Sequence, residues 1–68
     1  MKEFKIKDEY IKLGQLLKAA GLAENGVIAK EMILEGKAYV NGEADLRRGR
    51  KVCPGDIVSC EGEEIKVI

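Results

Sequence analysis

Apolar and polar residues alternate with two different periods along the 68-residue chain, and each period marks a kind of element. Near the N-terminus, Phe4 and Ile6 alternate with charged residues, which is typical of a short, half-buried strand. Two later stretches instead place apolar residues three and four positions apart, which is the period of an amphipathic helix. They contain Leu13, Leu16, Leu17 and Ala20 in the first stretch, and Ile28, Ala29, Met32 and Ile33 in the second.

Glycine residues mark the ends of these two predicted helices. We expect the first helix over about residues 14–20, with Gly14 as its N-cap and Gly21 just after its end. The segment LAENG is a loop, and the second helix follows it and ends at Gly36. Two short helices joined by a short loop predict a helical pair in which each helix buries one apolar stripe.

The second half of the chain returns to the alternation of strands. Ala38 and Val40 alternate with Lys37 and Tyr39, and the following Asn41-Gly42 is a strong signal for a two-residue hairpin turn. Two further strands are predicted, one at residues 57–60 and one in the C-terminal segment IKVI. The predicted fold class is therefore α+β, with the helical pair packed on a small, mostly antiparallel β-sheet.

Composition agrees with a single globular domain over residues 1–68. Hydrophobic residues make up 46% of the chain and charged residues 35%, and we find no internal repeat, linker or low-complexity tract. No apolar run approaches the roughly 18 residues that a membrane span needs. The N-terminal segment also lacks the apolar core of a signal peptide, so we expect a cytoplasmic location.

The chain contains two cysteines, Cys53 and Cys60, and no histidine. A disulfide is disfavoured in the cytoplasm, and a four-ligand zinc site would have to recruit carboxylates or a second chain. We therefore expect both residues to be small apolar side chains in or near strands. We expect neither a metal ion nor a cofactor.

Positive charge is concentrated in one short segment, although the chain has 12 basic and 12 acidic residues and is formally neutral. Arg47, Arg48, Arg50 and Lys51 occupy five consecutive positions together with Gly49, which leaves 8 basic and 12 acidic residues elsewhere. Such a dipolar chain would direct a polyanion to one face, and the arginine fork suits phosphate oxygens. The alternative is a solvated loop that only aids solubility, because short basic stretches often have no nucleic-acid role.

Four sequence matches, in order, connect these features to a known family. They are Lys12-Leu13-Gly14-Gln15-Leu16-Leu17, then Ala29-Lys30 followed by Met32-Ile33, then GKAYVNG at residues 36–42, and finally Pro54-Gly55-Asp56-Ile57. With these matches, residues 11–58 resemble the small RNA-binding domain first named from small-subunit ribosomal protein S-four, the αL-motif domain. The segments LGQLLKAAG and NGEADLRRGRK look closer still to the free-standing single-domain branch, the YaaA/YbcJ-like proteins.

The resemblance implies an RNA-binding surface formed by the helical pair and the basic loop that follows it. Many members have a Ser-Arg pair at the start of the second helix, where this chain has NGV with Gly26 in the arginine position. One phosphate contact is therefore missing, and the basic loop is expected to carry more of the binding. The predicted RNA-contacting residues are Lys12, Lys18, Lys30, Lys37, Arg47, Arg48, Arg50 and Lys51, of which Lys18 comes from helix geometry rather than from the resemblance.

The expected partner is a structured RNA that is recognised by its shape, because an A-form helix hides its major groove. The resemblance favours ribosomal RNA during subunit assembly. Only Phe4, Tyr10 and Tyr39 are aromatic, which argues against the stacking platform of a single-strand binder. Tyr39 is expected to face away from Ala38 and Val40, where it could stack on one base or pack on a neighbour.

Three other functions were weighed against RNA binding. An enzyme is disfavoured because the chain has no His or Thr, one Ser at position 59, no phosphate-binding glycine motif and little room for a cleft. A protein–protein adaptor could use the acidic C-terminal hairpin, with IKVI adding to a partner's sheet, although a closing core strand is the favoured interpretation of IKVI. A DNA-binding protein could use the same loop, but no helix has Arg or Asn spaced to read a major groove.

Overall fold

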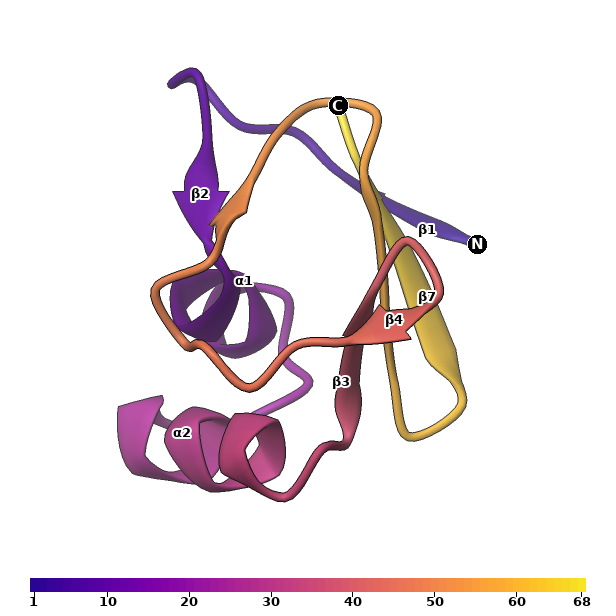
Figure 1. Ribbon diagram of the computed structural model, residues 1–68. Helices are drawn as coiled ribbons and strands as arrows, with labels where there is room; N and C mark the ends of the chain where they lie inside the picture. Colours follow the sequence, from indigo (N-terminus) through magenta and orange to yellow (C-terminus); the bar gives the residue numbers. More distant parts are fainter.

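The computed structural model describes every residue from Met1 to Ile68 and contains two helices and seven short strands (Figure 1). The helices are α1 (Leu13–Ala19) and α2 (Gly26–Leu34). The strands are β1 (Lys2–Phe4), β2 (Ile11–Lys12), β3 (Ala38–Val40), β4 (Glu43–Ala44), β5 (Lys51–Val52), β6 (Ile57–Cys60) and β7 (Glu63–Val67). Two helices packed on strands confirm the predicted α+β class.

Five strands form one sheet in the order β1-β7-β6-β3-β4, while β2 and β5 pair separately as an antiparallel ribbon. Within the larger sheet only β1 and β7 run parallel, so the mostly antiparallel arrangement is also confirmed. Because β7 is paired on both sides, by β1 and β6, it has no free edge. The interpretation of IKVI as a closing core strand is therefore right, and the alternative of edge pairing with a partner's sheet is wrong.

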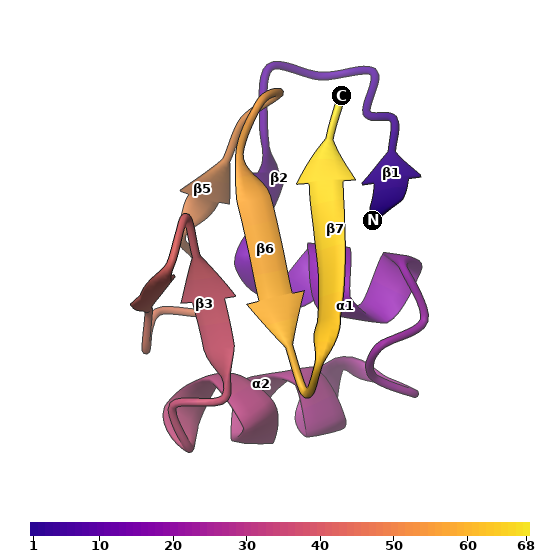
Figure 2. The ribbon, with the colours of Figure 1, turned by 90° about the vertical axis from the view of Figure 1, so that its right-hand side faces the viewer.

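Both helices cover the same face of the five-stranded sheet, and the opposite face is open (Figure 2). Strand side chains alternate between these faces, as the sequence predicts. Ala38 and Val40 of β3 are buried beneath the helices, whereas Tyr39 between them is 41% exposed on the open face. The fully buried leucines of α1 and the Ala29, Met32 and Ile33 side chains of α2 complete this core.

Ile28 does not join the apolar stripe in which the sequence places it. Its side chain is 37% exposed, because Ala29, Met32 and Ile33 already fill the sheet-facing side of α2. The helix starts also differ from those predicted. The N-cap of α1 is Lys12 rather than Gly14, and the N-cap of α2 is Asn25, whose side-chain oxygen accepts the Ile28 N–H at 2.9 Å.

The Asn41-Gly42 turn and the Pro54-Gly55-Asp56 turn are joined by hydrogen bonds. Asn41 and Gly42 both adopt positive φ, 52° and 86°, as the predicted hairpin turn requires. The Asn41 Nδ2 donates to Asp56 Oδ1 at 3.0 Å, and Asn41 Oδ1 accepts the Ile57 N–H at 2.9 Å. Asp56 Oδ2 in turn accepts the Cys53 N–H at 2.8 Å. The NG and PGD segments thus act together to hold two turns in register.

The two cysteines lie in different environments, and both are free thiols. Cys60 is buried in β6, where burial raises the pKa of its thiol. Cys53 lies just after β5, so both cysteines are in or near strands as expected, although the Cys53 side chain is exposed. Its position precedes the Pro54 turn, which directs the chain away from the core. Neither helix has the length and hydropathy needed to cross a bilayer.

Replacing Asp56 with Ala should lower the free energy of unfolding by about 1–3 kcal/mol, because it leaves the Cys53 N–H and the Asn41 amide without their acceptor. The Cys53 N–H, followed by the Asn41 amide, lowers the pKa of Asp56. This stabilisation is therefore present above about pH 4 and is lost as the pH falls through the folded-state pKa. Urea unfolding of the wild type and the variant between pH 3 and pH 7 measures both effects. Exposed Asp8→Ala is the control and should change little.

Candidate nucleic-acid interface

The basic loop, defined here as residues 47–51, lies against the first turn of α1. The carbonyl oxygens of Arg50 and Arg48 accept the N–H groups of Leu13 and Gly14 at 2.8 and 3.0 Å. These bonds satisfy two of the N–H groups that a helix N-terminus leaves unpaired. A Cβ atom on Gly14 would lie 3.5 Å from the Arg48 Cβ, so any side chain longer than a methyl would press on the loop. The loop is therefore positioned by backbone contacts with α1.

Asp45 organises the loop from the other side. Its carboxylate is only 8% exposed and accepts four hydrogen bonds from two arginines. Arg47 donates its backbone N–H at 2.9 Å, its Nε at 3.0 Å and its Nη2 at 2.8 Å, while Arg50 donates its Nη1 at 2.7 Å. The Arg47 side chain, then its backbone N–H, hold the pKa of Asp45 far below the usual value, against the effect of burial.

Two of the four basic side chains of the loop pair with Asp45, and the other two do not. Arg47 and Arg50 neutralise part of their charge on Asp45, although the Arg47 side chain remains 71% exposed and the Arg50 side chain 32%. Arg48 has no carboxylate partner and faces a hollow between the loop and the helical pair. The Lys51 ammonium lies over the Tyr10 ring, 4.9 Å from its centroid. Arg48 is thus the arginine of the loop whose charge is available to a ligand.

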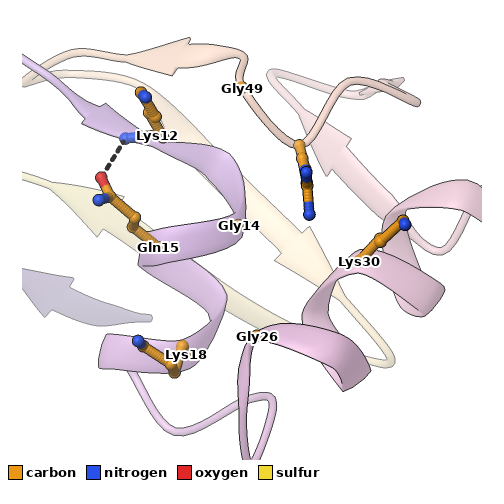
Figure 3. A pocket seen from close by; sticks show the side chains of 8 residues that line it. Lys12, Gly14, Gln15, Lys18, Gly26, Lys30 and Gly49 are labelled. Carbon is orange, nitrogen blue, oxygen red and sulfur yellow. Dashed lines mark hydrogen bonds between the residues drawn. The ribbon is translucent and has the colours of Figure 1, made fainter.

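A basic pocket of about 350 Å³ lies where the loop meets the two helices (Figure 3). Lys12 and Lys18 reach it from the two ends of α1, and Lys30 reaches it from α2 on the other side. Its lining contains no carboxylate and no apolar side chain, and consists of Lys12, Gly14, Gln15, Lys18, Gly26, Lys30, Arg48 and Gly49. Four cations and no acidic residue therefore line one pocket of a neutral chain.

A second, open hollow beside this pocket is lined by Arg47, Gly49, Arg50 and Lys51. Lys51 is also the cross-strand partner of Lys12 in the β2–β5 ribbon. Like charges directly opposite each other are unfavourable without a counterion, so an anion bound here would relieve their repulsion. Seven of the eight predicted site residues consequently lie on one connected surface around the pocket and the loop.

Lys37 is the predicted residue that the structure does not bring to this surface. Its ammonium pairs with the carboxylates of Glu35 at 3.3 Å and Glu61 at 3.5 Å. These neighbours, Glu35 first, raise the pKa of Lys37. Lys37 and its partners line a different, acidic hollow beside α2, so the prediction for this residue has no support from its position.

Sequence reasoning missed Asp45, although a signal was present. Its side chain accepts the N–H of the residue two positions later, which is the contact of an Asx turn, and Asp is a typical turn residue. Gln15 was also missed as a pocket residue. Its Oε1 accepts the Lys12 N–H at 3.4 Å (Figure 3), and the residue is part of the pocket lining.

Comparison with known proteins agrees with the architecture. The sequence matches the S4 domain family over residues 4–68, nearly the whole chain. The fold also superposes on the solution structure of YbcJ from E. coli with a TM-score of 0.77 at 35% identity, covering 100% of this chain and 87% of that one. That structure is described as revealing an αL motif involved in RNA-binding. The protein belongs to the S4 domain family.

Two named relatives match most of the chain. It is 47% identical over 57 residues to the "Probable ribosome maturation protein RlbA" of Bacillus subtilis (strain 168), covering 84% of this chain and 80% of that protein. It is 36% identical over 62 residues to the "Putative RNA-binding protein YbcJ" of Escherichia coli (strain K12), covering 91% and 89%. The chain therefore resembles small, free-standing members of the family along most of their length.

Replacing Asp45 with Asn should lower the free energy of unfolding by about 1–3 kcal/mol at neutral pH, because the charged acceptor of two arginines is lost. The folded-state pKa of Asp45 is depressed, so its contribution is complete above about pH 4 and falls as the pH drops further. Chemical unfolding at pH 7 and at several values below pH 4 should show the full difference between wild type and variant at pH 7 and a progressively smaller one as the pH falls toward the depressed pKa of Asp45. A difference that stays constant over the whole series would contradict the ion-pair account.

Proposed function

We propose that this protein is a non-catalytic RNA-binding protein that holds the backbone of a structured RNA in the basic pocket and along the basic loop. The observation that carries the proposal is the lining of the pocket. It includes Lys12, Lys18, Lys30 and Arg48 and not a single carboxylate, in a chain that has as many acidic as basic residues. A site of this kind attracts a polyanion by its field and releases counterions on binding.

The position of α2 adds to this field. The helix begins at Gly26 in the pocket wall, so the positive end of its dipole faces the same volume as the four side chains. The pocket is lined by basic residues, one amide and glycines and by no hydrophobic residue, which favours phosphate groups over a small apolar ligand. A-form RNA offers such phosphates at regular spacing while hiding its base edges, so shape would decide recognition.

Ribosomal RNA is the partner that we propose within this class. One relative carries ribosome maturation in its name and another RNA-binding, and both match more than four-fifths of this chain. A role in ribosome assembly would place the protein in the cytoplasm. The structure offers the adaptor alternative no free strand edge at β7, so RNA binding remains the better-supported function.

The first test separates the arginines of the loop. Arg48→Gln should weaken binding to a labelled RNA hairpin and flatten the dependence of the affinity on salt by about one phosphate contact. Arg47→Gln should instead mainly lower stability, because Arg47 is held by Asp45. Titrations of both variants and the wild type at two salt concentrations, with a duplex DNA of equal length as comparison, measure these effects. Equal binding of RNA and DNA, or no loss in Arg48→Gln, would overturn the proposal.

A gain of affinity is expected from Gly26→Arg, which places an arginine where related sequences carry one. The site is open, since a Cβ on Gly26 would meet no atom within 4 Å, and the residue lines the pocket. Charge-assisted contact with one more phosphate should tighten binding about threefold to tenfold at low salt and steepen the salt dependence. Gly26→Gln, which has similar reach without charge, is the matched control. Equal affinities of the two variants would contradict the assignment of the pocket.

A further inference from the structure

A hollow of about 470 Å³, half of whose lining residues are apolar, adjoins the basic pocket on the far side of α1. Its apolar part is formed mainly by Phe4, Ile6, Ile11 and Tyr10, and the first three of these side chains pack against the hydrophobic core. The charged residues Lys5, Lys7 and Asp8 also line it. The proposed function in its simplest form, phosphate binding in the basic pocket, makes no use of this hollow.

The hollow and the basic pocket share one wall. Gln15 and Lys18 of α1 line both, so the two sites form a continuous surface. Gln15 accepts a hydrogen bond through Oε1 from the Lys12 N–H, which leaves the donors of its amide group for a ligand. A phosphate beside Lys18 in the basic pocket would therefore have a partly apolar space within reach of the sugar and base attached to it.

The walls of the hollow are fixed in position before any ligand arrives. The Ile6 N–H donates to the Ile68 carbonyl at 3.0 Å, and the Ile68 N–H donates to the Phe4 carbonyl at 2.9 Å. Tyr10 is 37% exposed, and its ring is held by the Lys51 ammonium of the basic loop, 4.9 Å from the ring centroid. An exposed ring that is already ordered stacks on a ligand at a low cost in entropy.

We infer that this hollow receives one unpaired nucleobase of the RNA whose backbone occupies the basic pocket. The inference rests on the proposed function and narrows its ligand to an RNA helix interrupted by an unpaired nucleotide, such as a bulge. The lining of the hollow suits a flat aromatic ring with a polar edge. Such a ring can lie against Tyr10 and the apolar residues while its polar edge meets the Gln15 amide. A single base site is consistent with the scarcity of aromatic residues, which excludes a longer stacking platform.

The test compares three RNA hairpins of identical stem sequence at one salt concentration. The first is fully paired, the second has one bulged adenosine, and the third has an abasic nucleotide at the bulge. The wild-type protein should bind the adenosine bulge about 5- to 150-fold more tightly than the abasic bulge, the range that stacking of one base on an aromatic side chain gives. The abasic hairpin keeps the bent backbone, so this ratio isolates the base from the change in shape.

Two tyrosines of similar exposure provide a matched pair of variants. Tyr10→Ala should reduce the ratio of adenosine-bulge to abasic-bulge affinity to about one, whereas Tyr39→Ala, on the open face of the sheet, should leave it unchanged. Tyr10→Phe, which keeps the ring, should retain the preference. Any weakening that arises only because Lys51 loses its contact with Tyr10 would affect all three hairpins equally. Circular dichroism and thermal unfolding of each variant verify that it is folded.

The outcomes separate this inference from the function on which it rests. Wild-type protein that binds none of the hairpins would overturn both. Salt-sensitive binding to all three with equal affinity would retain the RNA-binding function and overturn the base site. A preference for the adenosine bulge that survives Tyr10→Ala, or that Tyr39→Ala removes, would likewise overturn the assignment of the base to this hollow.

Discussion

The carboxylate of Asp45 is the charge on which the arrangement of the basic loop depends. Three arginines and a lysine within five positions would repel one another, and a flexible loop would spread them into solvent. The nearly buried carboxylate binds two of the arginines and turns the chain back toward α1, where the carbonyls of the loop accept hydrogen bonds from the start of the helix. The Arg48 side chain, which pairs with no carboxylate, is left to line the pocket.

The two helices have separate roles within this arrangement. Their apolar stripes pack on one face of the sheet and provide the core, while the first turn of α1 and the first turn of α2 open onto the basic pocket. Because backbone hydrogen bonds and core packing set the spacing of Lys12, Lys18 and Lys30, the pocket is formed without ligand. Preorganised charge of this kind binds a phosphate backbone with little loss of conformational entropy.

The chain has no net charge, but its basic and acidic residues are largely separated in space. Seven basic residues line the pocket or belong to the loop, where Asp45 pairs with two of them. Other carboxylates lie away from this surface, as around Lys37, where Glu35 and Glu61 form ion pairs. The partly apolar hollow beside Tyr10 adds a third kind of surface, next to the basic one. A ligand that carries both phosphate and an aromatic ring would use the two together, and an unpaired nucleotide is such a ligand.

The sequence by itself determined the class of fold and the location of the positive charge. Hydrophobic periodicity identified both helices and the strands around Val40, Val58 and Val67, since burial of an apolar stripe depends on local spacing. The tertiary structure alone decided which basic side chains pair with a carboxylate and which do not. Asp45 lies close in sequence to the two arginines that it binds, but its near burial depends on the packed fold. The contact of Lys37 with Glu61 and the position of Gln15 between two hollows join segments that are far apart in the sequence, and no local pattern encodes them. Charged side chains are long and solvated, so their partners are set by the packing of the backbone beneath them rather than by their own sequence spacing.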